Sequence, residues 1–183
     1  MKKRVHDLLK GLPEDFVILV LLPSQRFQEA NVALLKRLLG RSKVAQGSYI
    51  TINRPYKALV ELFRREKINP EAVNFIDCVT EELHEKKEGL NCYFIDSPAS
   101  LTEIGIALDP LFKRENHEFV ILDSLDMLSA YNDREKILRF VHFLTNKFRL
   151  HKLKGVIISL KEETDRTLLD EMGKFCDKVI DLS

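Results

Sequence analysis

The polar residues that follow the apolar runs are the side chains of this sequence best suited to chemistry. In an open parallel sheet, ligands bind outside the carboxyl ends of the strands, and these residues would meet there. Arg26 or Arg54 would then be suited to hold a phosphate or another anion. The alternative is an ordinary solvated sheet edge, in which Arg54 pairs with Asp123 or a neighbour. The residues concerned are Ser24, Gln25, Arg26, Asn53, Arg54, Asp123, Ser124, Ser159 and Lys161.

A row of basic and polar side chains forms a second candidate surface. Its members are spaced three, four and three residues apart, so they share one face of a predicted helix. This face could bind nucleic acid or an acidic protein partner. It could also be a solvated helix face, because basic residues are favourable near a helix C-terminus. No aromatic residue interleaves the row for base stacking, so nucleic acid is not indicated. The row is Arg139, His142, Asn146 and Arg149, and Lys152 extends it.

Metal binding and nucleophilic catalysis are disfavoured by the cysteines and histidines. The three cysteines, Cys78, Cys92 and Cys176, are scattered, and the sequence has no CxxC or HExxH spacing. The histidines lack partners at the spacing of a catalytic triad, and no G-x-S-x-G elbow occurs. We therefore expect no disulfide framework, no metal site and no catalytic nucleophile.

The elements that would position these residues follow from the hydrophobic pattern. Apolar runs alternate with segments of helical periodicity, which indicates an α/β fold. Several runs are apolar throughout, as in strands that are covered on both faces. We expect three layers, with a mainly parallel sheet between helices. The predicted strands are 16–22, 48–52, 73–76, 92–95, 119–122, 156–160 and 179–182.

The predicted helices lie between these strands. A capping box from Ser100 to Glu103 predicts the start of the third helix, and Pro110 predicts a kink or break near Asp109. The polar segment 80–89 is predicted to be a loop or a short exposed helix. The helices are predicted over 28–39, 55–66, from 101 onward, 134–150 and 165–175.

Length and composition indicate one domain, which we expect to span residues 1–183, with 45% hydrophobic and 31% charged residues. Lys and Arg number 29 against 28 Asp and Glu, so a net charge of +1 gives no overall field for nucleic acid or an anionic membrane. The longest apolar run has seven residues, far below the ~20 of a membrane-spanning helix. The N-terminus also lacks the apolar core of a signal peptide, so we expect a cytoplasmic protein.

A family resemblance rests on the order of elements. The run that ends at Asp123-Ser124 is followed by a long helix, the run 155–160, a further helix and a last strand. This order resembles the second half of the RecA/KaiC-like ATPase core of the P-loop superfamily, and the run 47–52 resembles the second strand of that core. The sequence as a whole most resembles uncharacterised archaeal relatives of KaiC and RadA. The resemblance covers residues 12–182. It implies a RecA-like sheet, a Walker B role for Asp123 toward Mg²⁺, and oligomers such as rings or filaments.

Asp123 is singled out by its position in that order and not by its residue type. Aspartate is a common turn former, and four of the apolar runs end in one. The four are Asp77, Asp96, Asp123 and Asp181.

The phosphate-binding loop of that family is missing from the sequence. The family carries G-x-x-x-x-G-K-[ST] after its first strand, where backbone N–H groups and the lysine hold the phosphates. Here Leu22 is followed by Pro-Ser-Gln-Arg-Phe, which contains no glycine or lysine, and Pro23 has no N–H to donate. After the second strand, Asn53 stands where the KaiC-like family places a catalytic glutamate, and asparagine cannot accept a proton as a carboxylate can.

The two losses predict a pseudo-ATPase, which would act as a non-catalytic binding or regulatory module through protein interfaces. We expect a protein partner or self-association, no membrane, and no bound cofactor, ATP and Mg²⁺ included. The first alternative is a nucleotide sensor or an ATPase with an altered phosphate site, and the weaker one is a DNA-associated accessory factor. The residues of the vestigial nucleotide site would be Ser24, Arg26, Arg54, Asp123 and Ser124.

Overall fold

The computed structural model describes residues 9–40, 46–81, 83 and 89–182. A seven-stranded sheet in the order β4-β3-β2-β5-β6-β1-β7 forms its centre, and all neighbouring strands are parallel. The predicted α/β fold with a parallel sheet is therefore confirmed. The strands are β1 (Val17–Leu22), β2 (Gln46–Thr51), β3 (Val73–Asp77), β4 (Cys92–Phe94), β5 (His117–Asp123), β6 (Lys154–Leu160) and β7 (Lys178–Asp181).

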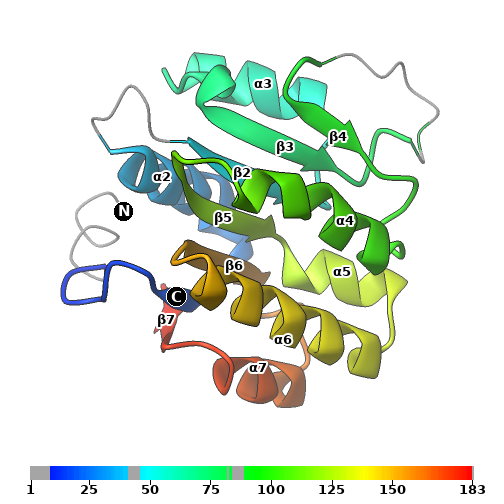
Figure 1. Cartoon of the computed structure of the whole chain (residues 1–183). Helices are drawn as coiled ribbons and strands as arrows, with labels where there is room; N and C mark the ends of the chain where they lie inside the picture. Colours follow the sequence, from blue (N-terminus) through cyan, green and yellow to red (C-terminus); the bar gives the residue numbers. More distant parts are fainter. Residues whose placement is uncertain (1–8, 41–45, 82, 84–88, 183) are drawn as a thin grey trace.

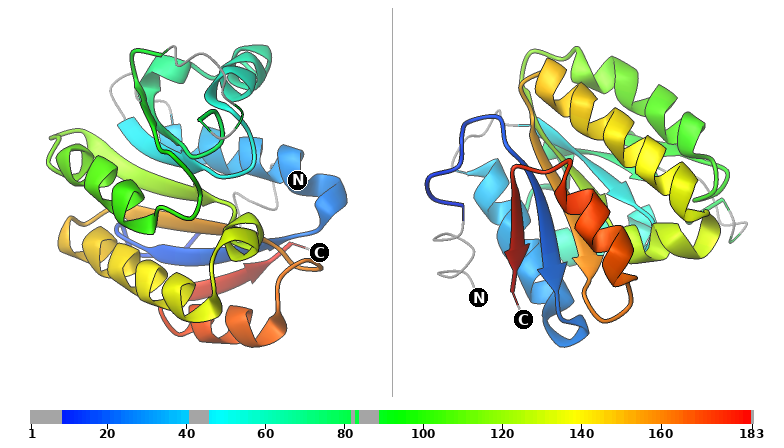
Figure 2. Two further views of the ribbon diagram at one scale, coloured as in Figure 1. Left: turned by 90° about the vertical axis from the view of Figure 1, so that its right-hand side faces the viewer. Right: turned by 90° about the horizontal axis from the view of Figure 1, so that it is seen from below.

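Helices cover both faces of the sheet and complete the three predicted layers (Figure 1). One face carries α2 (Phe27–Leu39) and α3 (Tyr56–Arg65). Two short 3-10 helices, η1 (Ser24–Arg26) and η2 (Pro70–Ala72), precede α2 and β3. The view from below shows the two helical layers on opposite sides of the strands (Figure 2). The other face carries α4 (Leu101–Phe112), α5 (Leu125–Tyr131), α6 (Arg134–Leu150) and α7 (Arg166–Gly173).

The apolar strands supply two separate hydrophobic cores. In β1, Val17 and Leu19 pack on the side of α4 to α7, whereas Ile18 and Val20 pack on the side of α2 and α3. Because successive side chains of a strand point to opposite faces, a strand covered on both faces must be apolar throughout. This requirement explains why the strands could be recognised as continuous apolar runs.

Of the kink or break predicted near Asp109, the break is wrong. The helix α4 continues through Pro110 and ends at Phe112. Leu108 and Leu111 are fully buried on its inner side. Burial of these two side chains is worth more than the one backbone hydrogen bond that proline cannot donate.

Three local features differ from the sequence prediction or lie largely outside the described residues: the cap of α4, the helix α5 and the segment 80–89. Within the described residues Ser100 accepts no capping bond, and the Glu103 carboxylate instead accepts from the Asp96 N–H at 3.3 Å. The helix α5 is not predicted from the sequence, because its seven residues are too few to establish a period. The loop predicted over 80–89 falls largely outside the described residues.

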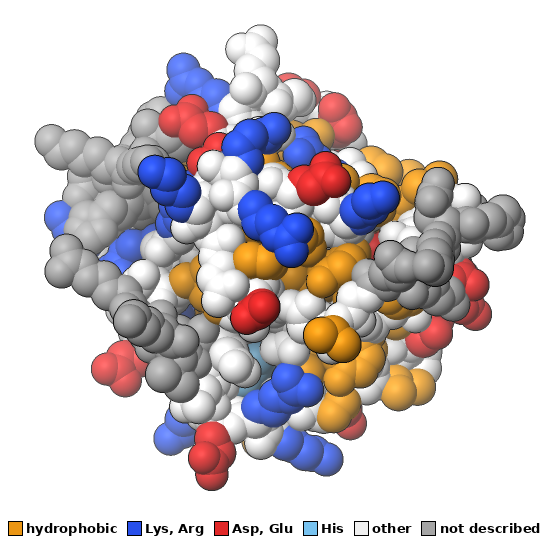
Figure 3. Space-filling model, turned by 90° about the horizontal axis from the view of Figure 1, so that it is seen from above, with side chains coloured by type: hydrophobic (Ala, Val, Ile, Leu, Met, Phe, Trp, Pro, Cys, Tyr) orange, Lys and Arg blue, Asp and Glu red, His pale blue; other side chains and the backbone are white. Residues whose placement is uncertain are grey.

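The described surface carries both charge signs. Figure 3 looks down on the end of the sheet that bears α3, and Lys and Arg side chains are interspersed there with Asp and Glu. This mixture agrees with the formal net charge of +1. None of the described helices is long and apolar enough to cross a bilayer.

Candidate functional site

Asp123 is the last residue of β5 and lies at the carboxyl edge of the sheet. In register it stands between Thr51 of β2 and Ile158 of β6. Asp123 is only 1% exposed, and its side chain accepts hydrogen bonds from Asn31 of α2 and Tyr49 of β2. The aspartate that the resemblance singles out is therefore a buried residue.

One carboxylate oxygen of Asp123 is the acceptor of a buried network. Its Oδ2 atom accepts from the Asn31 amide at 2.9 Å and from the Tyr49 hydroxyl. The Asn31 Nδ2 atom also donates to the Tyr49 oxygen at 2.6 Å. The Oδ1 atom of Asp123 has no hydrogen-bond partner among the described residues.

Burial controls the ionisation of this network. It raises the pKa of Asp123 to about 6, although the hydrogen bonds from Tyr49 and Asn31 and the charge of Arg54 act in the opposite direction. Burial and the neighbouring Asp123 raise the pKa of Tyr49 well above its ordinary value. Tyr49 therefore remains a protonated hydrogen-bond donor at neutral pH.

The space beside Asp123 is too small for a phosphate group. The cavity at this point offers about 10 Å³ to the centre of a water-sized sphere, which is the volume that one water molecule needs. A hydrated Mg²⁺ ion with attached phosphates is far larger. The cavity walls come from α2, β2, β5, α3 and the turn before α3, and include Phe27, Gln28, Asn31, Tyr49, Arg54, Phe63 and Asp123.

The five residues predicted for the nucleotide site do not all line this cavity. Ser24 and Arg26 are exposed on η1 and are not among its lining residues, although Phe27, which follows Arg26, is. Arg54 does line it, and its guanidinium donates to a glutamine side chain of α2 at 2.9 Å. Ser124 follows Asp123 through a cis peptide bond and is fully buried. Of the five, Arg54 and Asp123 alone share the described cavity.

Asn31 and Tyr49 are the residues of this network that sequence reasoning missed. Asn31 lies among the buried residues of α2, between Ala30 and Val32. Tyr49 lies in the middle of the buried strand β2. The signal in the sequence is a polar side chain inside an apolar stripe. Such a side chain predicts a buried hydrogen-bond partner, because buried polar groups almost always have one.

The other aspartates at strand ends have structural roles. Asp77 accepts from the backbone N–H groups of Tyr56 at 2.6 Å, Val79 at 2.8 Å and Thr80 at 2.9 Å. It thereby joins the start of α3 to the turn after β3. Asp181 forms an ion pair of 2.7 Å with a lysine that follows β6. The interpretation of such aspartates as turn formers suits Asp77.

The predicted basic face of α6 is divided between two surroundings. The His142 ring packs on Phe175 with a centroid distance of 5.1 Å, and Arg149 pairs with Asp177 at 3.1 Å. Both side chains thus contact the segment after α7. The remaining members of the row, Arg139, Asn146 and Lys152, are exposed.

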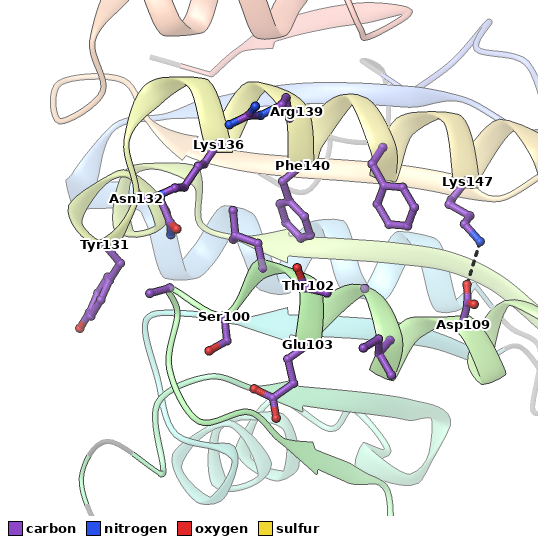
Figure 4. A pocket seen from close by; sticks show the side chains of 15 residues that line it. Ser100, Thr102, Glu103, Asp109, Tyr131, Asn132, Lys136, Arg139, Phe140 and Lys147 are labelled. Atoms are coloured by element: carbon purple, nitrogen blue, oxygen red, sulfur yellow. Dashed lines mark hydrogen bonds and ion pairs between the residues drawn. The ribbon is translucent and has the colours of Figure 1, made fainter.

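Arg139 also lines a groove between α4 and α6, with a volume of about 970 Å³ (Figure 4). Lys136 and Arg139 lie on its α6 side, and Glu103 lies on its α4 side. An ion pair of 2.8 Å between Lys147 and Asp109 joins the two helices farther along. Sequence reasoning did not predict this groove.

The residues around Asp123 do not fit Mg²⁺ and ATP in the way that the resemblance implies. The N–H of Arg26 donates to the Pro23 carbonyl at 3.0 Å, so it is used within the turn. The Oδ2 atom of Asp123 already accepts two hydrogen bonds, and the adjoining cavity holds one water-sized sphere. Among the described residues, no group of three or more His, Cys, Asp or Glu is placed to hold a metal ion.

Comparisons with known proteins agree with this fold. The model of a family of unknown function, DUF7504, matches residues 18–182. No curated protein matches the chain.

Three structures from Pyrococcus horikoshii are similar. The KaiC-like protein PH0186 is 12% identical with a TM-score of 0.58, over 93% of this chain and 72% of that one. The uncharacterized protein PH0321, in complex with an unknown peptide, is 10% identical with a TM-score of 0.67, over 98% and 82%. The protein PH0250 is 12% identical with a TM-score of 0.64, over 98% and 88%. At these identities the likeness shows the fold, which is RecA/KaiC-like as the sequence resemblance implied.

Proposed function

This chain belongs to the DUF7504 family, and we propose that it is a non-catalytic binding or regulatory module that acts through protein interfaces. In this proposal the RecA/KaiC-like sheet is a scaffold, and the position of the nucleotide is filled by the protein's own side chains. The carboxyl edge of the sheet then has a structural role, and the function lies on the outer surface of the helices.

The burial of Asp123 is the observation that carries this proposal. A Walker B aspartate must face the water shell of Mg²⁺. Here the carboxylate bonds to Asn31 and Tyr49 and is 1% exposed. The turn before α2 has neither the glycines nor the lysine of a phosphate-binding loop, and its arginine is exposed.

A protein partner is supported by two further observations. The groove between α4 and α6 has about 970 Å³, and large apolar side chains are exposed along it. In addition, the structure of PH0321 holds an unknown peptide, so a protein of this fold can bind a polypeptide. We infer that this chain also uses its surface for a polypeptide partner.

The experiment that tests the proposal is isothermal titration calorimetry of Mg-ATP into the pure full-length chain, together with thermal melts. A ligand present at about 100 times its dissociation constant would stabilise the fold by about 2.7 kcal/mol. We expect no heat of binding and an unchanged melting temperature. We also expect no release of phosphate above the rate of a buffer control.

Two matched variants make the outcome specific. Arg26→Ala removes the cation that the nucleotide-sensor alternative requires, and Arg65→Ala removes an exposed arginine of α3 as a control. Micromolar binding of Mg-ATP that is lost in Arg26→Ala and kept in Arg65→Ala would contradict the proposal. It would favour the nucleotide-sensor alternative instead.

A further inference from the structure

The groove between α4 and α6 is apolar along its centre and open to solvent. Of its lining side chains, Ile106 of α4 is 68% exposed and Phe143 of α6 is 42% exposed. Gly105 brings the two helices close, since a Cβ atom there would lie 3.3 Å from the Phe143 ring. Large apolar side chains gathered in this way on one face are typical of a protein–protein contact.

The two walls of the groove carry opposite charges. The lining cations Lys136, Arg139 and Lys147 all belong to α6, and the lining anions Glu103 and Asp109 both belong to α4. Lys147 and Asp109 neutralise each other across the groove (Figure 4). Arg139 makes no hydrogen bond or ion pair with the rest of the described chain. The end of the groove near Arg139 and Glu103 therefore has one basic and one acidic wall.

We propose that a second copy of this chain docks in the groove, so that two grooves face each other around a twofold axis parallel to α4 and α6. The two helices run side by side in the same direction (Figure 4). Rotation about this axis places α6 of one copy on α4 of the other. Arg139 then faces Glu103 of the partner subunit, and Phe143 packs on Ile106 of the partner subunit. In such an isologous contact each pair forms twice.

Charge complementarity selects this occupant and this axis. A twofold axis that ran across the helices would place α6 on α6 and bring cations against cations, which is unfavourable. A helix of another protein would need acidic residues along one edge and basic residues along the other edge to match both walls. A second copy of this chain already meets this requirement, because its own groove has a basic wall on α6 and an acidic wall on α4.

The inference rests on the proposed function in that it names the partner of the interface. Its test uses no nucleotide, so each proposal can fail without the other. The assay is sedimentation velocity of the full-length chain. We expect a dimer of about 42 kDa, twice the 21.2 kDa of one chain, at a concentration of about 50 μM.

Charge reversal makes the test specific to the proposed axis. Arg139→Glu places two glutamates opposite each other at both symmetric contacts, and Glu103→Arg does the same with arginines. Each variant alone should bind itself about 30-fold more weakly, or about 2 kcal/mol, which is the usual scale for two exposed ion pairs that are reversed. A mixture of the two variants should form a heterodimer, because every contact then joins opposite charges again.

Arg65→Glu, on the opposite face of the sheet, is the matched control and should leave the dimer unchanged. Ile106→Lys gives a second readout, since its exposed side chain can be replaced without loss of the monomer fold and the dimer should weaken. A monomer at this concentration would overturn the proposal and leave the groove to a segment of another protein. A dimer that Arg139→Glu and Ile106→Lys both leave intact would also overturn it, as would two folded charge variants that stay apart when mixed.

Discussion

Asp123→Asn should stabilise the protein at neutral pH. Burial raises the pKa of Asp123 from 3.8 to about 6 in the folded chain, so the folded chain holds this proton more tightly than the unfolded chain does. The contribution of Asp123 to wild-type stability therefore falls as the pH rises from 3.8 to 6, and it stays at the lower level above that range. A shift of about two pKa units corresponds to about 3 kcal/mol of unfolding free energy.

Asparagine has the shape of aspartate and keeps one oxygen that can accept from Tyr49 and Asn31. Its NH₂ group would replace the Oδ1 atom, which has no partner among the described residues, and an unpartnered buried donor costs about 1 kcal/mol. We therefore expect Asp123→Asn to gain about 2 kcal/mol at pH 7.5, and to lose about 1 kcal/mol near pH 4, where wild-type Asp123 is protonated.

The measurement is urea unfolding followed by circular dichroism over this pH range. Asp96→Asn is the matched control, because this aspartate also follows an apolar run but is exposed, and it should change stability little at any pH. If Asp123→Asn changed stability equally at pH 7.5 and near pH 4, burial would not raise the pKa of Asp123. If the loss were larger at pH 7.5 than near pH 4, the folded chain would favour the ionised carboxylate, and a cation beside Asp123 would have to be sought.

Three further perturbations test other parts of the structure. Burial lowers the pKa of His117 to about 4, so the contribution of His117 to stability should fall as the pH drops from 6.5 toward 4, opposite in sign to the contribution of Asp123. In the same urea titration, the stability of the wild type relative to His117→Gln should therefore fall over this range. A stability difference between the two proteins that does not change with pH would contradict that assignment. Gly155→Ala should cost about 1–3 kcal/mol in urea unfolding, because its Cβ would overlap the buried ring of Phe148. Gly105→Ala, whose Cβ meets only a half-exposed ring at 3.3 Å, is the control and should cost little. Asp77→Ala should lower the free energy of unfolding by about 2–4 kcal/mol in the same urea assay, since it leaves three backbone N–H groups without their acceptor, and a neutral result would refute its structural role.

Much of the fold could be predicted from the sequence, because the double burial of the strands leaves an unmistakable pattern. The run that forms β1 is apolar at every position for this reason, and β6 contains the apolar core 156–158. Position in the order of elements also placed Asp123 correctly at the end of a central strand. The helix α5 left no comparable signal, because seven residues do not establish a period.

The interior of the candidate site could not be predicted in the same way. Asn31 and Asp123 are 92 residues apart, and their bond depends on how α2 packs over β2 and β5. A linear pattern contains the type of each residue but not the angle at which a helix crosses a sheet. The pairing of Arg149 with Asp177 has the same origin, since it depends on how α7 lies beside α6.

The division of the interior into two cores has a consequence for how this protein tolerates change. The sheet keeps the residues of α2 and α3 apart from those of α4 to α7, with fully buried strands between them. Side chains that share no neighbours contribute to stability independently. A substitution such as Leu34→Val in one layer therefore does not need compensation at Leu144 in the other. The two helical layers can diverge separately, so the surface of α4 and α6 is free to adapt to a partner while the layer that covers Asp123 stays unchanged.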